Sequence, residues 1–319
     1  MQRWLLNRLF AADQPAPHFA FYGTVNWMRA LAILVEHEGY SRDALKEFYR
    51  SVSRRQVDTS ADTLVFESVF LAFNHLAGLG AITSVEDGYD VCRPAISAWY
   101  HCVHSSAAAM LAAASGDRCE GAEGLAEGWQ EHLVSQRLVR APFSLAVSTL
   151  VKADAEAEVD KLRGGNAFDL GRTPSNFDEA LGAAISYLHG TVKFDRERIE
   201  YQVRESEEFA QLGVSDFRTR AARELRDLHL RARSVNFVSE AVRYVGKAGF
   251  RDSIFLSYGD NHEVEIDRFL ADLMVVAVEF LRMTCTYCSA RTEVGTWDEF
   301  VSDVEANSQV SLDASILRV

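Results

Sequence analysis

The chain has 319 residues, of which 48% are hydrophobic and 25% are charged, and its formal net charge is −13. With only 5 Pro, no low-complexity tract and no block of like charges, this composition argues against long disordered linkers and is enough for one large core or two ordinary ones. The negative net charge disfavours binding to bare nucleic acid or anionic membrane outside a local basic patch.

No membrane association is expected from the apolar segments. The N-terminal apolar run lacks a small-residue cleavage site, and the longest apolar stretch, 269–281, contains Asp272 and Glu279. Five cysteines without a disulfide-framework spacing are typical of a reducing compartment. The sequence therefore predicts a cytoplasmic protein.

The first 93 residues predict three helices and a hairpin. Periodic apolar residues indicate helices over 24–38, over 42–52 with Ser41 as the N-cap, and from Thr59 or Ser60 to Gly78. Asp87 and Gly88 between β-branched residues are typical of a β-hairpin. Residues 20–93 thus resemble the winged-helix fold, and we expect a domain over 1–93.

In the winged-helix family the third helix usually reads the DNA major groove. Here that helix is apolar and is accompanied by Asp58, Asp62 and Glu67, which would repel phosphates. The module is therefore expected to serve packing or partner binding, with a DNA-binding regulator as a further alternative.

From Pro94 the pattern is helical throughout, which predicts an all-α domain over 94–319. Pro94 suits a first helical turn, Pro142 introduces another helix, and 163–174 is an irregular loop. Capping boxes are expected at Ser175 with Asp178 and at Thr296 with Glu299. The remaining helices are expected over 94–115, 129–137, 175–212, 216–233, 236–247 and 264–291 and from 296 onward.

The helix over 94–115 carries Trp99, Tyr100 and His101, and a glycine-rich loop separates it from the segment WQEHLVSQRLV. This arrangement resembles the helical superfamily called HEPN. The resemblance implies a prokaryotic toxin or defence setting, and in the ribonuclease members a metal-independent R-x4–6-H motif. Arg223 and His229 have that spacing, so Arg223 would stabilise charge at the scissile phosphate and His229 would transfer a proton. A solvated charged face, with Asp227 paired to Arg223 or Arg231, is the alternative.

Arginines gather between residues 218 and 251, in contrast to the acidic chain as a whole. Interleaved arginines and aromatic residues can grip phosphates and stack bases, so contact with RNA or another nucleic acid is expected here. Alternatively, these residues pair with neighbouring acids such as Glu205, Glu207 and Glu208, or dock on an acidic protein partner. The candidate binding residues are Arg218, Arg220, Arg226, Arg231, Arg233, Arg243, Lys247 and Arg251.

The other candidate groups predict packing rather than chemistry. His101 and His104 are only two possible ligands, so no metal site follows, and Cys285 with Cys288 is expected to lie in the core. The chain has no Walker A, G-x-G-x-x-G or G-x-S-x-G motif, so no cofactor is expected. We therefore expect a helical protein that binds nucleic acid or a partner, with a metal-independent ribonuclease as its enzymatic form. The competing hypothesis is a non-catalytic adaptor or oligomeric scaffold.

Overall fold

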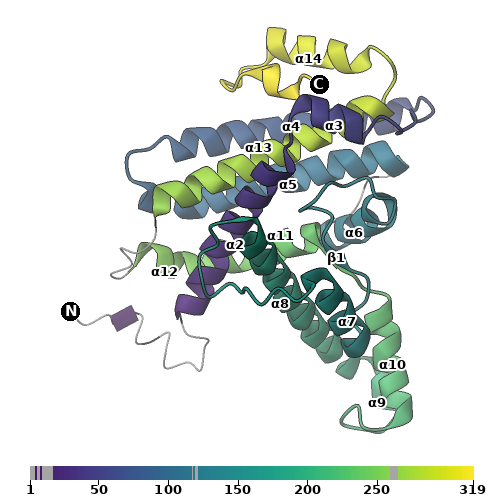
Figure 1. Ribbon diagram of the computed structural model, residues 1–319. Helices are drawn as coiled ribbons and strands as arrows, with labels where there is room; N and C mark the ends of the chain where they lie inside the picture. Colours follow the sequence, from purple (N-terminus) through teal and green to yellow (C-terminus); the bar gives the residue numbers. More distant parts are fainter. Residues whose placement is uncertain (1–3, 6–7, 9–16, 117, 119–120, 259–264) are drawn as a thin grey trace.

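Helices form almost all of the regular structure in the computed structural model, which describes residues 4–5, 8, 17–116, 118, 121–258 and 265–319 (Figure 1). In the described residues one short sheet is present, in which β1 (Ala146–Val147) pairs antiparallel with β2 (Val235–Asn236). The prediction of a mainly α protein is confirmed.

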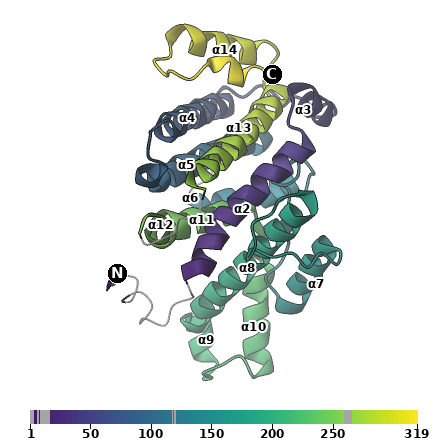
Figure 2. The same cartoon turned by 60° about the vertical axis from the view of Figure 1, so that its left-hand side comes forward.

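Four long helices form the centre of the molecule: α2 (Pro17–Glu38), α4 (Thr59–Thr83), α5 (Gly88–Ser115) and α13 (Ile266–Arg291). α4, α5 and α13 run side by side, and α2 runs across this group and packs on α13 (Figures 1 and 2). Trp27 of α2, Phe73 of α4, Trp99 of α5 and Phe280 of α13 are fully buried in the core that these helices share. Burial of such large apolar surfaces is the main stabilising term of the fold.

The remaining elements, of which only α8 is long, surround this centre. They are α3 (Arg42–Phe48), α6 (Gly121–Gly128), the π-helix η1 (Trp129–Val134), α7 (Lys152–Arg163), α8 (Phe177–Arg204), α9 (Glu207–Gln211), α10 (Arg220–Arg231), α11 (Phe237–Lys247), the π-helical turn η2 (Ala248–Asp252), α12 (Ser253–Ser257), α14 (Thr296–Asn307) and the 3₁₀ turn η3 (Ala314–Leu317).

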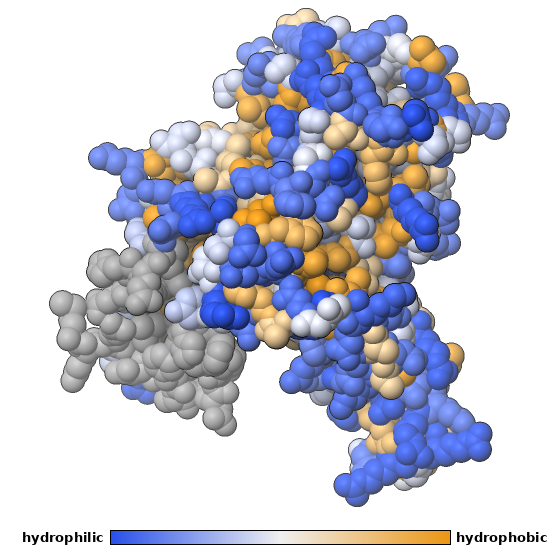
Figure 3. All heavy atoms as spheres, in the orientation of Figure 1, coloured by the Kyte–Doolittle hydropathy of each residue, from blue (hydrophilic) through white to orange (hydrophobic). Residues whose placement is uncertain are grey.

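The C-terminal half of α8, together with α9 and α10, projects from the body as an arm (Figure 1). A second, smaller core holds the arm together, and Leu188, Ile199, Phe209 and Leu230 are among its buried residues. The outer surface of the arm is mostly hydrophilic (Figure 3). The arm therefore presents polar side chains to solvent on an internally packed support.

The predicted hairpin at Asp87 and Gly88 does not form. α4 continues through Gly78 to Thr83, and Asp87 instead caps α5 by accepting a hydrogen bond from the backbone N–H of Tyr89. A β-carbon at Gly88 would lie 3.0 Å from Leu270 of α13, so this glycine permits close helix packing. Asp87 and Gly88, which resemble a turn in the sequence, thus begin helix α5. The β-hairpin wing expected from the winged-helix resemblance is not formed.

The structure also differs from the predicted domain boundary between residues 93 and 94. That boundary falls inside α5, and Pro94 lies within this helix rather than in its first turn. One hydrophobic core joins Trp27, Trp99 and Phe280, which come from both sides of the boundary. The chain before Pro94 is therefore packed into the same body as much of the chain after it.

Helix ends show which local predictions were right. Ser41 caps α3 through a hydrogen bond from Ala44 N–H, as expected, whereas the cap of α8 is Asn176, not Ser175. α14 begins after Gly295 with no side-chain cap, so the predicted Thr296 capping box is wrong. The helix expected after Pro142 is also wrong, because this segment forms turns and then strand β1.

Among the described helices, α4 alone is long and apolar enough to cross a membrane by length and composition. This helix differs from the longest apolar stretch of the sequence, 269–281, which lies within α13. In the structure Val65, Val69 and Phe73 of α4 are buried in the main core.

Candidate nucleic-acid interface and the adjoining cavity

Helix α10 packs Ala222 and Leu230 against the arm core and exposes most of its arginines, together with Leu228, which is 65% exposed. Thr219 caps the helix by accepting a hydrogen bond from Ala222 N–H, and Ala222 and Leu230 are buried. The segment 218–233 contains six arginines and only two acidic residues, Glu224 and Asp227. Most of these charges must therefore lie on the outside of the arm.

Four arginines of this segment are exposed. The side chains of Arg218 and Arg220 are 91% and 87% exposed, with ion pairs to Asp216 at 3.2 Å and to Glu224 at 2.7 Å. Such exposed pairs contribute little, about 0–1 kcal/mol, and can be exchanged for a ligand. Arg223 and Arg231 are exposed and pair with no carboxylate of the described residues. We call Arg218, Arg220, Arg223 and Arg231 the arm arginines.

Three of the arm arginines share one face of α10. At about 100° per residue, Arg220, Arg223 and Arg231 fall within an arc of roughly 80°. The buried Ala222 lies opposite Arg220 and Arg231, and the buried Leu230 lies beside Arg223, which is therefore at the edge of this face. A single extended polyanion could therefore contact all three guanidinium groups.

Two further predicted binding residues have structural partners. Arg226 donates to Asp227 through Nε at 2.9 Å and Nη2 at 2.8 Å and lies over the ring of Phe217. Lys247 Nζ lies 3.4 Å from the carboxylate of buried Asp252. The predicted pairing of Asp227 with Arg223 or Arg231 is therefore wrong, because Arg226 takes this carboxylate.

The alternative pairing with acids of neighbouring helices is formed by Arg233, which pairs with Glu123 and Glu127 of α6, but the described residues show no pairing of these arginines with Glu205, Glu207 or Glu208. The backbone of Arg251 lies in η2, and its side chain is outside the described part of the structure.

Arg223 and His229 are both exposed on α10. Because the two residues are six positions apart on the helix, their side chains point about 120° apart and lie on different faces. A cavity lies at the base of the arm, between α6, α8 and α11, and neither Arg223 nor His229 lines it. The helix thus keeps the sequence spacing of the pair but does not place the two groups in a shared pocket.

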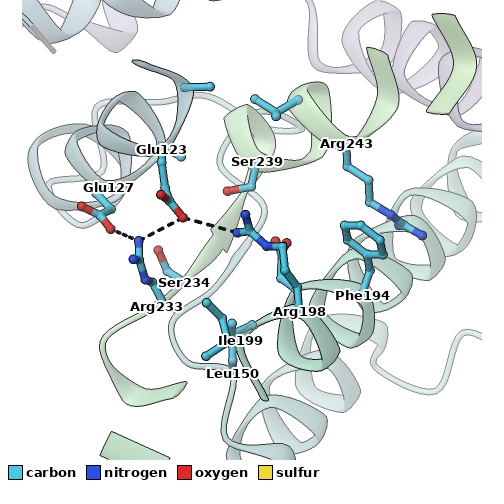
Figure 4. A pocket seen from close by; sticks show the side chains of 14 residues that line it. Glu123, Glu127, Leu150, Phe194, Arg198, Ile199, Arg233, Ser234, Ser239 and Arg243 are labelled. Atoms are coloured by element: carbon cyan, nitrogen blue, oxygen red, sulfur yellow. Dashed lines mark hydrogen bonds and ion pairs between the residues drawn. The ribbon is translucent and has the colours of Figure 1, made fainter. Parts of the chain in front are cut away.

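Arg233 and Arg243, also predicted to bind, line opposite sides of this cavity, which has a volume of about 240 Å³ (Figure 4). The cavity lies between α6, α8 and α11 and the chain just after α10. Its apolar lining includes Leu150, Ile199 and Val242. The polar residues of its wall are Glu123, Glu127, Asp195, Arg198, Arg233, Ser234, Ser239 and Arg243.

One wall of the cavity is an ion-pair network between α6 and the arm. Glu123 of α6 lies 3.4 Å from Arg198 and 3.5 Å from Arg233, and Glu127 also pairs with Arg233 (Figure 4). Arg198 additionally lies 3.4 Å from Asp195. Burial raises the pKa of Asp195, and the nearby arginines, Arg198 first, oppose that shift.

Arg243 is held on the other side of the cavity without a carboxylate partner among the described residues. Its guanidinium donates to Thr191 Oγ1 at 2.8 Å and lies 5.2 Å from the ring centre of Tyr187 and 5.3 Å from that of Phe194. Glu240, one turn earlier on α11, is buried, and desolvation raises its pKa well above the usual value. Arg243 is therefore a preorganised cation with free N–H donors.

Apart from Arg233 and Arg243, the residues that line the cavity were not predicted as site residues from the sequence. Phe194 and Arg198 are one helical turn apart on α8, so their shared face could have been read from an i, i+4 spacing. Nothing local indicates that Glu123 joins them, because it lies far away in the chain. The cavity is a product of tertiary packing.

The remaining candidate residues lie between helices of the body. The ring of His101 stacks on that of His75 of α4 with centroids 5.2 Å apart, and His104 is half-buried beside Tyr100. In the described part of the chain, no group of three or more His, Cys, Asp or Glu side chains could hold a metal ion.

Cys285 and Cys288 are buried, and desolvation raises the pKa of both thiols, which confirms the prediction that they are core residues.

No family model matches this chain, and neither a curated protein nor a solved structure matches it. Its function is therefore inferred from the arm and its cavity alone.

Proposed function

We propose that this protein binds single-stranded RNA along the exposed face of the arm. The observation that supports the proposal is the row of arm arginines on a projecting helix in a chain with a net charge of −13. Guanidinium groups bind phosphates through paired N–H donors, and those of Arg223 and Arg231 have no carboxylate of the described residues to displace. The local charge therefore opposes the repulsion that the rest of the chain exerts on a polyanion.

A stacking residue lies on the same arm. Tyr201 of α8 is 62% exposed, so its ring is available to a base of a bound strand. Proteins that bind single strands combine basic side chains with aromatic residues on which bases stack. This combination favours a single strand over a duplex, whose bases are already stacked.

The test is fluorescence anisotropy of a labelled 20-nucleotide single-stranded RNA at low salt. We expect saturable binding by the wild-type protein and at least tenfold weaker binding by the variant Arg223→Glu with Arg231→Glu. The matched control is Arg50→Glu with Arg118→Glu, which makes the same charge change at exposed arginines outside the arm. Equal loss in both double variants would mean that net charge alone governs binding. No binding by the wild type would favour an acidic protein partner.

The ribonuclease hypothesis adds that RNA bound to the arm is cleaved there, with Arg223 and His229 as the catalytic residues. Incubation of labelled RNA with the protein in EDTA should then yield fragments, and His229→Ala should abolish them without lowering the melting temperature. RNA that stays intact with the wild-type protein would leave binding as the activity, as in an adaptor or scaffold.

A further inference from the structure

The cavity at the base of the arm has the features of a ligand site. We propose that it binds a nucleoside monophosphate group, either as a free nucleotide or as the phosphorylated end of an RNA strand. The proposal goes beyond RNA binding by the arm, because it rests on Arg198, Arg243 and Phe194, none of which is an arm arginine.

The anion-binding part of the proposed site is Arg243. A guanidinium fixed by Thr191 and two aromatic rings loses little conformational freedom when it binds, so its contact with a phosphate is favourable. No described carboxylate lies within ion-pair distance of this guanidinium, and Asp195 and Glu240 interact with it only at longer range. A phosphate oxygen would supply that missing partner.

Glu123, on the wall opposite Arg243, occupies a second position where an anionic group of the ligand could bind (Figure 4). It bridges Arg198 and Arg233 at 3.4 and 3.5 Å, distances longer than the roughly 2.7–2.9 Å of a strong charge-assisted hydrogen bond. The Glu123 side chain is 57% exposed, so it can turn into water when a ligand arrives. An anionic group of the ligand that reached this wall would thus replace the Glu123 carboxylate and approach Arg198 and Arg233 more closely, while Glu127 kept its ion pair with Arg233.

The remaining lining suits the nucleoside. Phe194 is 50% exposed at the cavity, and Leu150 and Ile199 form an apolar surface beside it. The hydroxyls of Ser234 and Ser239 line the cavity and form no hydrogen bond with the described residues, so they are available to ribose or phosphate oxygens. The volume of about 240 Å³ is below the roughly 300–1,000 Å³ of drug-sized sites, which fits one nucleotide unit.

Isothermal titration calorimetry of the full chain with AMP, UMP, adenosine and inorganic phosphate tests the proposal. We expect AMP and UMP to bind and adenosine to bind at least tenfold more weakly, since it lacks the phosphate. Arg243→Gln should weaken AMP binding about tenfold or more. The matched control is Arg172→Gln, which removes an arginine that also lies over a phenylalanine ring, that of Phe168, outside the cavity.

A second variant separates a binding role from a structural one. Glu123→Gln should tighten AMP binding several-fold, because it removes the carboxylate that competes for Arg198 and Arg233. If these arginines only fasten α6 to the arm, Glu123→Gln would lower the melting temperature and leave AMP binding unimproved. This outcome, or no heat of binding with AMP and UMP at millimolar concentration, would overturn the proposal.

Oligonucleotides with and without a 5′-phosphate show whether the cavity binds a strand end or a free nucleotide. Tighter binding of a 5′-phosphorylated oligonucleotide than of its 5′-hydroxyl form, lost in Arg243→Gln, would assign the cavity to a strand terminus. AMP binding without such a preference would assign it to a free nucleotide. Loss of RNA binding in Arg223→Glu with Arg231→Glu, while AMP still binds, would show that the arm and the cavity are separate sites.

Discussion

Replacing Gly182 by alanine tests how tightly the irregular loop before α8 is packed on this helix. An added β-carbon would lie 2.6 Å from Oδ1 of Asn166 and 2.7 Å from the β-carbon of Phe168. Asn166 holds the loop, because its Oδ1 accepts from Phe168 N–H at 2.9 Å and its Nδ2 donates to the Asp178 carbonyl at 2.6 Å. The methyl group must therefore displace the residue that fixes the loop.

The expected change combines three contributions. Overpacking costs about 1–3 kcal/mol and one weakened hydrogen bond costs about 1 kcal/mol. Replacing a helical glycine by alanine recovers about 1 kcal/mol. Gly182→Ala should therefore destabilise the fold by about 1–3 kcal/mol, as measured by urea denaturation followed by circular dichroism.

Gly78 of α4 provides the matched control. It is also a helical glycine, but an added β-carbon meets nothing within 4 Å, so Gly78→Ala should stabilise the fold by up to about 1 kcal/mol. Similar unfolding free energies for the two variants would refute the packing of Asn166 and Phe168 on α8.

Three further predictions concern the body and the arm. Burial, with a smaller effect of the neighbouring His101, lowers the pKa of His75 and His104, so the folded state binds fewer protons than the unfolded state. The melting temperature should then fall as the pH drops from about 6.5 toward these lowered values, and less so in His75→Gln with His104→Gln. The ion pair between Arg29 and Asp272, whose side chains are 18% and 6% exposed, should show strong coupling in a double-mutant cycle. Arg29→Met or Asp272→Leu alone should cost about 3–5 kcal/mol, and the double variant should cost less than the sum; additive costs would argue against the contact. Leu230→Ala should destabilise the arm by about 2–5 kcal/mol and speed amide exchange in α10 but not in α13, and uniform acceleration would mean that the arm has no core of its own.

The parts of the fold that could be predicted depend on short-range patterns. The buried face of α5, with Ile96, Trp99 and Met110, follows from a 100° repeat within one helix. Asp87 and Gly88 could not be assigned in this way, because an aspartate before a glycine suits both a tight turn and a helix cap. The contact of Gly88 with Leu270 of α13, distant in the chain, decides between them.

The same distinction applies to the candidate site. The arm arginines could be predicted because they lie close together in one stretch of sequence on a single helix and the loop before it. Arg226 has the same sequence signal but packs on Phe217, and only the fold reveals that difference. The cavity joins Glu123, Arg198 and Arg243 from three helices, so its existence depends on tertiary structure.

The salt dependence of RNA binding shows whether the arm arginines contact RNA phosphates. For single strands the slope of log affinity against log salt concentration is about −0.7 for each phosphate contact. Arg223→Gln with Arg231→Gln should therefore make the slope shallower by about 1.4, whereas Arg50→Gln with Arg118→Gln should leave it unchanged. An unchanged slope in the arm variant, or no RNA binding by the wild-type protein at low salt, would mean that the arm arginines do not bind RNA phosphates.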